Sequence, residues 1–174
     1  EATTLDVTLF AQEVENFIQR DPLTGFFSNV EQSSFRGVEA ALALRPLERL
    51  GLDLSYTRLH TRDDSPGGDR KQIQYTPGHK FVAQADARVT PRLDAHVAVS
   101  WLAEQYYYSR GTPRLRAQLD DYALLDTRLA WRAPGERVSL HVGADNLLDR
   151  DYAESYGLPQ AGRLVYGGVE LTFD

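Results

Sequence analysis

The chain has 174 residues, no cysteine and a formal net charge of −6 at pH 7. That length is enough for one domain with a sizeable core, and a diffuse acidic balance argues against a nucleic-acid-binding protein, which needs a basic surface. The absence of cysteine excludes a disulfide framework and a thiolate metal site. The sequence contains no run of about 18 apolar residues, which a membrane-spanning helix would need. A transmembrane strand, by contrast, needs apolar residues only at alternate positions.

Apolar and polar residues alternate along eight segments, a period of two that predicts strands with one apolar and one polar face. In the first segment, residues 3–19, Leu5, Val7 and Leu9 share the apolar face. Residues 20–34 are polar and carry turn signals, so we expect a connection there. The other expected strands are residues 35–44, 50–60, 80–89, 93–108, 122–132, 137–145 and 165–173.

The connections between these strands alternate between long and short. Residues 45–49, 90–92 and 133–136 form the short ones. Outer-membrane barrels have short periplasmic turns and longer extracellular loops, and their strands need roughly 9–11 residues to cross the bilayer. A soluble meander has no reason to keep this alternation. The pattern predicts an all-β, antiparallel up-and-down transmembrane barrel with both chain ends on the periplasmic side.

The polar faces of the expected strands carry charges near mid-strand. A dry core would make unpaired charges there costly, so we expect lipid against the apolar face and water or ion partners against the polar face. The charged positions are Glu39, Asp53, Asp86, Arg88, Glu104, Asp126, Arg128 and Glu170. Aromatic residues near strand ends suggest interfacial girdles, although aromatics favour strands in any case. They are Tyr56, Trp101, Tyr106, Tyr107, Tyr108, Tyr122, Trp131, Tyr152 and Tyr166.

Polar pairs on these faces do not form a recognisable catalytic or metal site. His96 and Ser100 share a face, as do Ser139 and His141, but no third oriented partner is evident. Residues 63–74 resemble a calcium loop only faintly, since Gln74 stands where a bidentate glutamate is required. We therefore expect no catalytic residue, no metal and no cofactor.

The long connection after residue 108 is the best candidate for ligand binding, because loops commonly carry function. It combines aromatic rings with arginines, which suits an anionic aromatic ligand such as a ferric catecholate. Its candidate residues are Tyr106, Tyr107, Tyr108, Arg110, Arg114 and Arg116. The alternative, interfacial aromatics beside an ordinary solvated loop, is the interpretation that we favour.

The last thirty residues carry a family resemblance. They contain the run Asn146-Leu147-Leu148-Asp149-Arg150-Asp151-Tyr152, the turn Gly157-Leu158-Pro159-Gln160-Ala161-Gly162-Arg163 and an alternating strand ending in Phe173. Two earlier strand openings, Arg36-Gly37-Val38-Glu39 and Tyr75-Thr76-Pro77-Gly78-His79-Lys80, fit the same pattern. Together these motifs resemble the C-terminal third of TonB-dependent outer-membrane receptors.

The resemblance implies energised uptake of a scarce ligand, a ferric siderophore, haem or cobalamin, across the bacterial outer membrane and without enzyme chemistry. Its implied partners are outer-membrane lipid, a plug and further barrel strands that residues 1–174 do not contain, and TonB, reached only through the plug. Residues 1–174 are then a single barrel segment with no plug domain and no nucleic-acid partner. Asn146, Leu147, Asp149, Tyr152, Gly162, Arg163 and Phe173 carry the motif, and Arg163 is expected to fix the last hairpin.

Two alternatives stay open at this point. Eight strands also suffice for a small barrel closed on itself, whose interior is filled by side chains and whose role is structural or adhesive. A soluble lipocalin-like barrel is the other; it requires a larger apolar interior and no apolar exterior.

Overall fold

The computed structural model describes residues 2–20, 26–65, 72–109, 115–135 and 137–173, which form one antiparallel sheet and two small hairpins. The sheet contains β1 (Ala2–Arg20), β2 (Phe27–Leu47), β3 (Leu50–Asp63), β4 (His79–Thr90), β5 (Leu93–Ala103), β8 (Tyr122–Arg132), β9 (Val138–Asp145) and β12 (Leu164–Leu171), in that order. The small hairpins pair β6 (Tyr106–Tyr108) with β7 (Arg116–Gln118), and β10 (Ala153–Ser155) with β11 (Leu158–Pro159). Within the described ranges, no helix is long and apolar enough to cross a membrane.

The sheet is open. Each of its eight strands pairs with its neighbour in the order of the chain, while β1 and β12 form the two edges and do not pair with each other. The expectation of an antiparallel up-and-down sheet of eight strands is confirmed. The arrangement closed on itself is not what the structure shows.

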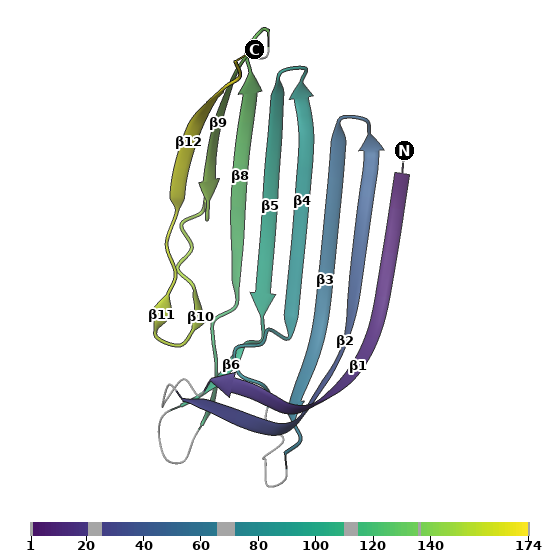
Figure 1. Cartoon of the computed structure of the whole chain (residues 1–174), viewed down its shortest axis with the longest axis vertical. Coiled ribbons are helices and arrows are strands. Elements are labelled where there is room, and N and C mark those ends of the chain that lie inside the picture. The colour runs from purple at the N-terminus through teal and green to yellow at the C-terminus, as the bar shows by residue number, and fades with distance from the viewer. Residues whose placement is uncertain (1, 21–25, 66–71, 110–114, 136, 174) are drawn as a thin grey trace.

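The connections follow the predicted alternation. Figure 1 shows the short turns between β2 and β3, β4 and β5, and β8 and β9 at one end of the sheet, which we call the turn end. Both termini also lie at this end. The longer connections gather at the opposite end, the loop end, where the far parts of β1 and β2 bend away from the other strands.

The strand register joins the apolar positions into one continuous surface, the apolar face. Leu5 of β1 lies opposite Leu42, Leu42 opposite Leu54, and Leu54 opposite Ala83. The row then continues across β5 and β8 through Val99 and Leu125. The apolar face is exposed rather than enclosed: Val97 and Leu140 are 39% and 42% accessible. This arrangement excludes an interior lined by these residues, as a lipocalin-like barrel would require.

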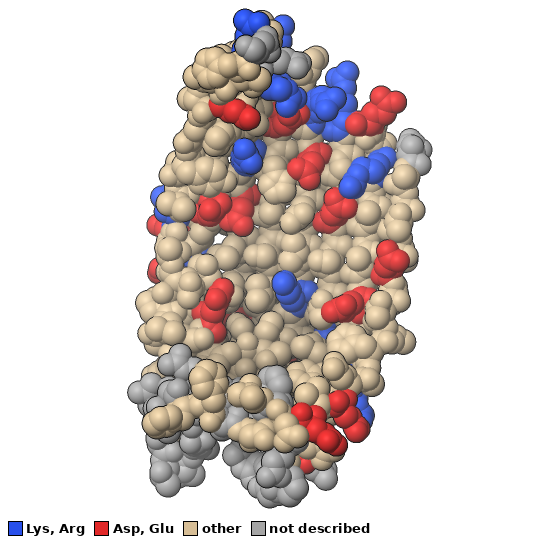
Figure 2. Space-filling model, viewed as in Figure 1, with Lys and Arg blue, Asp and Glu red and all other residues tan. Residues whose placement is uncertain are grey.

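The opposite surface, the polar face, is hollowed and carries the mid-strand charges. Asp86 lies opposite His96, and His96 opposite Arg128, in successive strands. A groove of about 600 Å³ opens on this face at the turn end. Figure 2 shows acidic and basic side chains spread along most of the length of the strands on the face in view.

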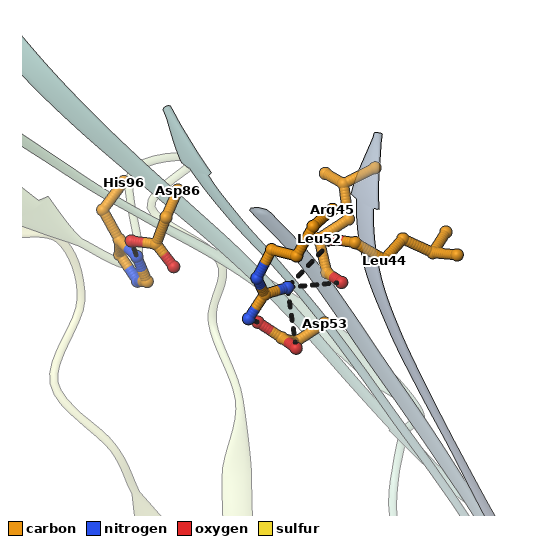
Figure 3. A network of polar contacts seen from close by, with 6 residues as sticks. All are labelled: Leu44, Arg45, Leu52, Asp53, Asp86 and His96. Atoms are coloured by element: carbon orange, nitrogen blue, oxygen red, sulfur yellow. Dashed lines mark hydrogen bonds and ion pairs between the residues drawn. The ribbon is translucent and has the colours of Figure 1, made fainter. Parts of the chain in front are cut away.

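Several charges on the polar face are paired. Arg45 donates two hydrogen bonds to Asp53, at 3.2 Å and 3.1 Å, and the His96 Nδ1 lies 2.8 Å from Asp86 Oδ1. Figure 3 shows these two pairs on the same side of the sheet, with Leu44 pointing to the other side. Close pairing lowers the cost of holding charge on this surface, because each ion keeps a nearby counter-ion.

Two expected strand bounds were wrong. The second strand begins at Phe27 rather than at residue 35, since the polar residues before Phe35 continue the ladder; Ser33 and Ser34 pair with Asp63 and Arg62 and are buried. Polarity does not prevent pairing where another strand supplies the hydrogen bonds. The strand expected over residues 93–108 ends at Ala103. Its backbone turns at Glu104, whose φ of 57° lies in the left-handed region and breaks the extended conformation.

The predicted girdle is also only partly correct. Tyr56, Trp101 and Trp131 lie on the apolar face. Tyr122 and Tyr166 lie on the polar face instead, because each is offset by an odd number of residues from the apolar positions of its strand. The ring of Tyr166 covers Gly143, its cross-strand neighbour.

Candidate functional site

The predicted ligand-binding residues sit on the small hairpin of β6 and β7 at the loop end. Tyr106 pairs with Gln118, and Tyr108 pairs with Arg116. The hairpin begins directly after the break at Glu104, whose backbone N–H donates to Asp121 Oδ1 at 3.0 Å. This bond ties the two sides of the connection together. Arg110 and Arg114, predicted as part of the same site, lie outside the described residues.

Each of the three tyrosines is engaged within the protein. The guanidinium carbon of Arg116 lies 3.6 Å from the ring centroid of Tyr106, a cation–π contact. The ring of Tyr107 stacks on Tyr156 with centroids 4.5 Å apart. Tyr108 is buried, and its hydroxyl donates to the carbonyl of Gln72 at 3.4 Å. The three rings therefore do not form one open aromatic surface.

The connection before β4 packs against this hairpin and holds it in place. Tyr75 N–H donates to the Tyr106 carbonyl at 2.9 Å, and the Arg116 Nη2 donates to Gln72 Oε1 at 3.0 Å. Ile73 and Thr61 are buried beside it, joined by a hydrogen bond from Ile73 N–H to Thr61 Oγ1. These two connections of the loop end thus pack against each other, which the sequence did not predict because their contacts join residues 31 to 44 positions apart.

One face of Arg116 and Tyr106 is left available by this packing. Arg116 is exposed and Tyr106 is half-buried, while Tyr107 and Tyr108 are held by contacts within the protein. A cation held over a ring at the rim of the sheet can contact an anionic ligand by charge-assisted hydrogen bonds. Ligand contact by these residues stays a prediction.

A second polar cluster at the loop end was not foreseen. Arg58 Nη1 donates to Glu104 Oε2 at 2.6 Å, and His79 Nε2 lies 3.6 Å from the same oxygen. The Tyr56 hydroxyl and His79 Nδ1 are 2.6 Å apart. The hydrogen bond from Arg58 holds the pKa of Glu104 below its ordinary value, against the opposing effect of partial burial. The sequence separation of 46 residues between Arg58 and Glu104 hid this pair.

The family motif builds the turn that follows β9. Asn146 is only 5% accessible, with φ at 48°, a left-handed conformation that asparagine tolerates better than most residues. Its side chain donates to the Arg150 carbonyl at 2.9 Å and accepts from the Arg150 N–H at 2.8 Å. Leu147 N–H donates to the Leu125 carbonyl of β8 at 2.7 Å. The turn is thereby closed on itself and fastened to the sheet.

The remaining motif residues fasten the last hairpin to that turn. Asp149 Oδ1 accepts from the Arg163 N–H at 2.8 Å, and Arg163 Nη1 donates to the Leu147 carbonyl at 3.3 Å. A Cβ on Gly162 would lie 2.7 Å from Asp149 Oδ1, so a larger residue there would displace the carboxylate that accepts from the Arg163 N–H. The ring of Tyr152 packs on Tyr122 at 4.7 Å. Phe173 lies beyond the last strand and is highly exposed.

An open sheet with an exposed apolar face and a hollowed polar face is a sector of a transmembrane β-barrel. The chain matches the TonB dependent receptor-like, β-barrel family over residues 1–147, and it belongs to that family. The bacterial outer membrane is accordingly its location.

Relatives with known names support the assignment. The iron-regulated outer membrane virulence protein of Vibrio cholerae is 28% identical over 152 residues, which cover 83% of this chain and 22% of that protein. The vitamin B12 transporter BtuB of the same species is 28% identical over 178 residues, covering 96% of this chain and 26% of that protein. The chain thus spans about a quarter of the length of these relatives, rather than the third expected from the resemblance.

Solved structures show the same fold. The ferric yersiniabactin uptake receptor FyuA from Yersinia pestis superposes with a TM-score of 0.78 and 22% identity, over 99% of this chain and 28% of that one. The ferripyoverdine receptor of the outer membrane of Pseudomonas aeruginosa gives a TM-score of 0.77 and 16% identity, over 96% and 24% of the two chains. In both, the matched part is one sector of a larger molecule.

Proposed function

We propose that this chain forms the C-terminal barrel sector of a TonB-dependent receptor that takes up a scarce ligand across the outer membrane. The observation that carries the proposal is the family match on a sheet whose two edge strands, β1 and β12, each have no partner on their outer side among the described strands. An edge of this length is a liability in isolation and is satisfied by further strands of a larger barrel. The role is binding and passage, with no covalent change to the ligand.

The polar face would then form part of the lumen wall and face the plug. Its groove at the turn end is lined by Arg49, Asp86, Asp94, His96 and Arg128 among others. Among the described residues, Arg128 has no ion-pair partner, although it is exposed on this surface. An unpaired cation in a confined lumen attracts acidic groups. The plug, which lies inside the barrel, could supply an acidic side chain opposite Arg128. TonB would act on this sector only through that plug.

A ferric siderophore is the ligand class we propose first. Its support is the iron-regulated relative together with the structural likeness to receptors for ferric yersiniabactin and ferripyoverdine. Cobalamin is the second candidate, favoured by the likeness to BtuB over almost the whole chain. At the loop end, Arg116 over Tyr106 is the described pair best placed to touch an anionic iron chelate.

Transport by the full-length receptor tests the proposal. The receptor would be expressed in a host lacking its own siderophore and cobalamin receptors, and uptake of ⁵⁵Fe-loaded siderophores and of labelled cobalamin would be compared with and without TonB. We expect TonB-dependent uptake of one class. If neither class enters in a TonB-dependent way, the proposed function is wrong.

The role of Arg116 is tested in the same assay. Arg116→Ser should raise the concentration needed for half-maximal uptake several-fold, because a charge-assisted contact is lost. Arg150→Ser is the matched control: Arg150 is another exposed arginine after the end of β9, and its hydrogen bonds to Asn146 use only its backbone. An equal half-maximal concentration for the two variants would show that Arg116 does not contact the ligand, without contradicting the proposed uptake function.

A further inference from the structure

The apolar face changes character in successive rows toward the loop end. Tyr56, Phe81 and Trp101 lie side by side in β3, β4 and β5 and form an aromatic row. One step further toward the loops, Arg58 and His79 lie opposite each other. Between the turn end and the aromatic row, the described strands place no charged side chain on this face. The first cations therefore appear immediately above a row of the kind that marks a membrane interface.

The depth of the apolar band fits a bilayer. Trp101 lies opposite Ala123, which precedes Trp131 by eight positions in β8. At about 3.3 Å per residue and a tilt of about 40°, that interval spans roughly 20 Å of membrane thickness, which the rings at both ends extend toward the ~25 Å of an outer-membrane apolar band. In β5 and β8 the aromatic row thus lies at the boundary of the acyl region on the loop side.

The next row beyond Arg58 and His79 pairs Arg36 of β2 with His60 of β3. Arg36 lies four positions beyond Ala40, which faces Tyr56 in the aromatic row. Four residues rise about 13 Å along a strand, or about 10 Å along the membrane normal after tilt. That height is at the outer limit of the headgroup region, which extends about 5–8 Å beyond the acyl core on each side. The long arginine side chain can reach back from there toward the headgroups.

The two rows differ in how their charge is compensated. In the first, Glu104 binds Arg58 and lies near His79. In the second, both Arg36 and His60 are exposed, and among the described residues neither has an ion-pair or hydrogen-bond partner for its side chain. Their neighbour on β1 is Ala11, which offers no counter-charge. The acids of β1 on the same face, Glu13 and Glu15, lie in rows further from the membrane.

We propose that Arg36 and His60 bind the phosphate of an anionic lipid headgroup in the outer leaflet. Arginine is always charged and presents a planar donor set that matches a phosphate bidentately, and an imidazole N–H donates in either protonation state. An anionic leaflet attracts an arginine that lies within a Debye length of its surface. Continuity with the aromatic row favours lipid over a soluble anion or a protein partner, since the same strands contact acyl chains directly below.

A local lipid probe tests the proposal in the full-length receptor. Ala11 faces Arg36 and is exposed, and residues 1–174 contain no cysteine that would compete for labelling of Ala11→Cys. Any cysteine in the rest of the receptor is replaced by serine, so that the fluorophore reports on this site alone. In nanodiscs of phosphatidylcholine, we would compare its quenching by spin-labelled phosphatidic acid and by spin-labelled phosphatidylcholine at equal amounts. We expect the phosphomonoester lipid to quench several-fold more strongly. Equal quenching in the wild-type background would overturn the proposal.

Substitutions separate a specific site from general attraction. In the combined variant Arg36→Ser with His60→Ser, the quenching ratio should fall to about one. Lys80→Ser is the control, because Lys80 is an exposed cation on the polar face, in a row three positions closer to the turn end. An unchanged ratio in the combined variant, or an equal fall in Lys80→Ser, would sink the proposal. If the combined variant does not show the heat-modifiable migration of a folded barrel, the single variants Arg36→Lys and Arg36→Gln replace it. Only Arg36→Lys should then keep the stronger quenching by phosphatidic acid than by phosphatidylcholine.

Discussion

The carboxylate of Asp126, in the middle of the sheet, accepts a hydrogen bond of 2.8 Å from the backbone N–H of Asn146. Asp126 belongs to β8, whereas Asn146 begins the turn after β9. One side chain on the polar face thus fixes the start of the turn carrying the family motif. The sequence singled out Asp126 as a lumen charge and Asn146 as a motif residue, without relating them.

Replacing Asp126 by alanine should destabilise the receptor. The change leaves the nearly buried N–H of Asn146 without its acceptor, at a cost of about 1–3 kcal/mol in the free energy of unfolding. Asp126→Asn keeps an oxygen acceptor and should cost less. Asp120→Ala, at an exposed loop position, provides the baseline. Urea unfolding of the refolded full-length receptor in liposomes measures all three, and equal stability of Asp126→Ala and Asp120→Ala would contradict the assigned bond.

At Asn146, alanine should be worse than glycine. Both replacements remove the two side-chain hydrogen bonds to Arg150, each worth about 1 kcal/mol. Glycine adopts the positive φ of 48° freely, while alanine adds backbone strain of about 1 kcal/mol or more. The same unfolding assay should give the order wild type, Asn146→Gly, Asn146→Ala. An alanine variant as stable as the glycine variant would show that the turn conformation costs nothing.

Gly143→Ala should destabilise the sheet because the ring of Tyr166 occupies the space of a Cβ. A Cβ at this position would lie 2.4 Å from the Tyr166 Cζ and 2.5 Å from its hydroxyl oxygen. Overpacking of this kind costs roughly 1–3 kcal/mol. Combining it with Tyr166→Ser should recover most of the loss, so a double-mutant cycle measures the coupling. Additive effects would mean that the ring moves aside freely.

The fold was predictable from the sequence because side chains alternate between the two faces of a strand regardless of which strands pair with it. Alternation placed Leu54 and Asp53 on opposite faces, and the register confirms it. Breaks in that period were harder to foresee. The left-handed conformation of Glu104 ends β5 early, and glutamate is not a residue type that favours this conformation, so the sequence does not predict the turn.

The site was less predictable, for a physical reason. The residue types of Tyr106 and Arg116 suggested a cation–π contact with a ligand, but the ring and the cation satisfy each other within the hairpin. Composition identifies groups able to interact and does not say which partner each will find. The row of Arg36 and His60 likewise needs the register of β2 and β3, since the two residues are 24 positions apart in the sequence.

Acidification should weaken the loop end through Glu104. Arg58 lowers the pKa of this carboxyl below 4.5, so the folded protein binds its proton less readily than the unfolded chain does. The stabilisation by Glu104 is therefore fully present above pH 4.5 and is lost as the pH falls through the folded pKa. Glu104→Gln should be less stable than wild type at pH 7, and the gap should close on acidification below pH 4.5. Unfolding curves of both receptors across this range check the sign, with Asp120→Asn as an exposed control; a gap that widens at low pH would contradict the pairing with Arg58.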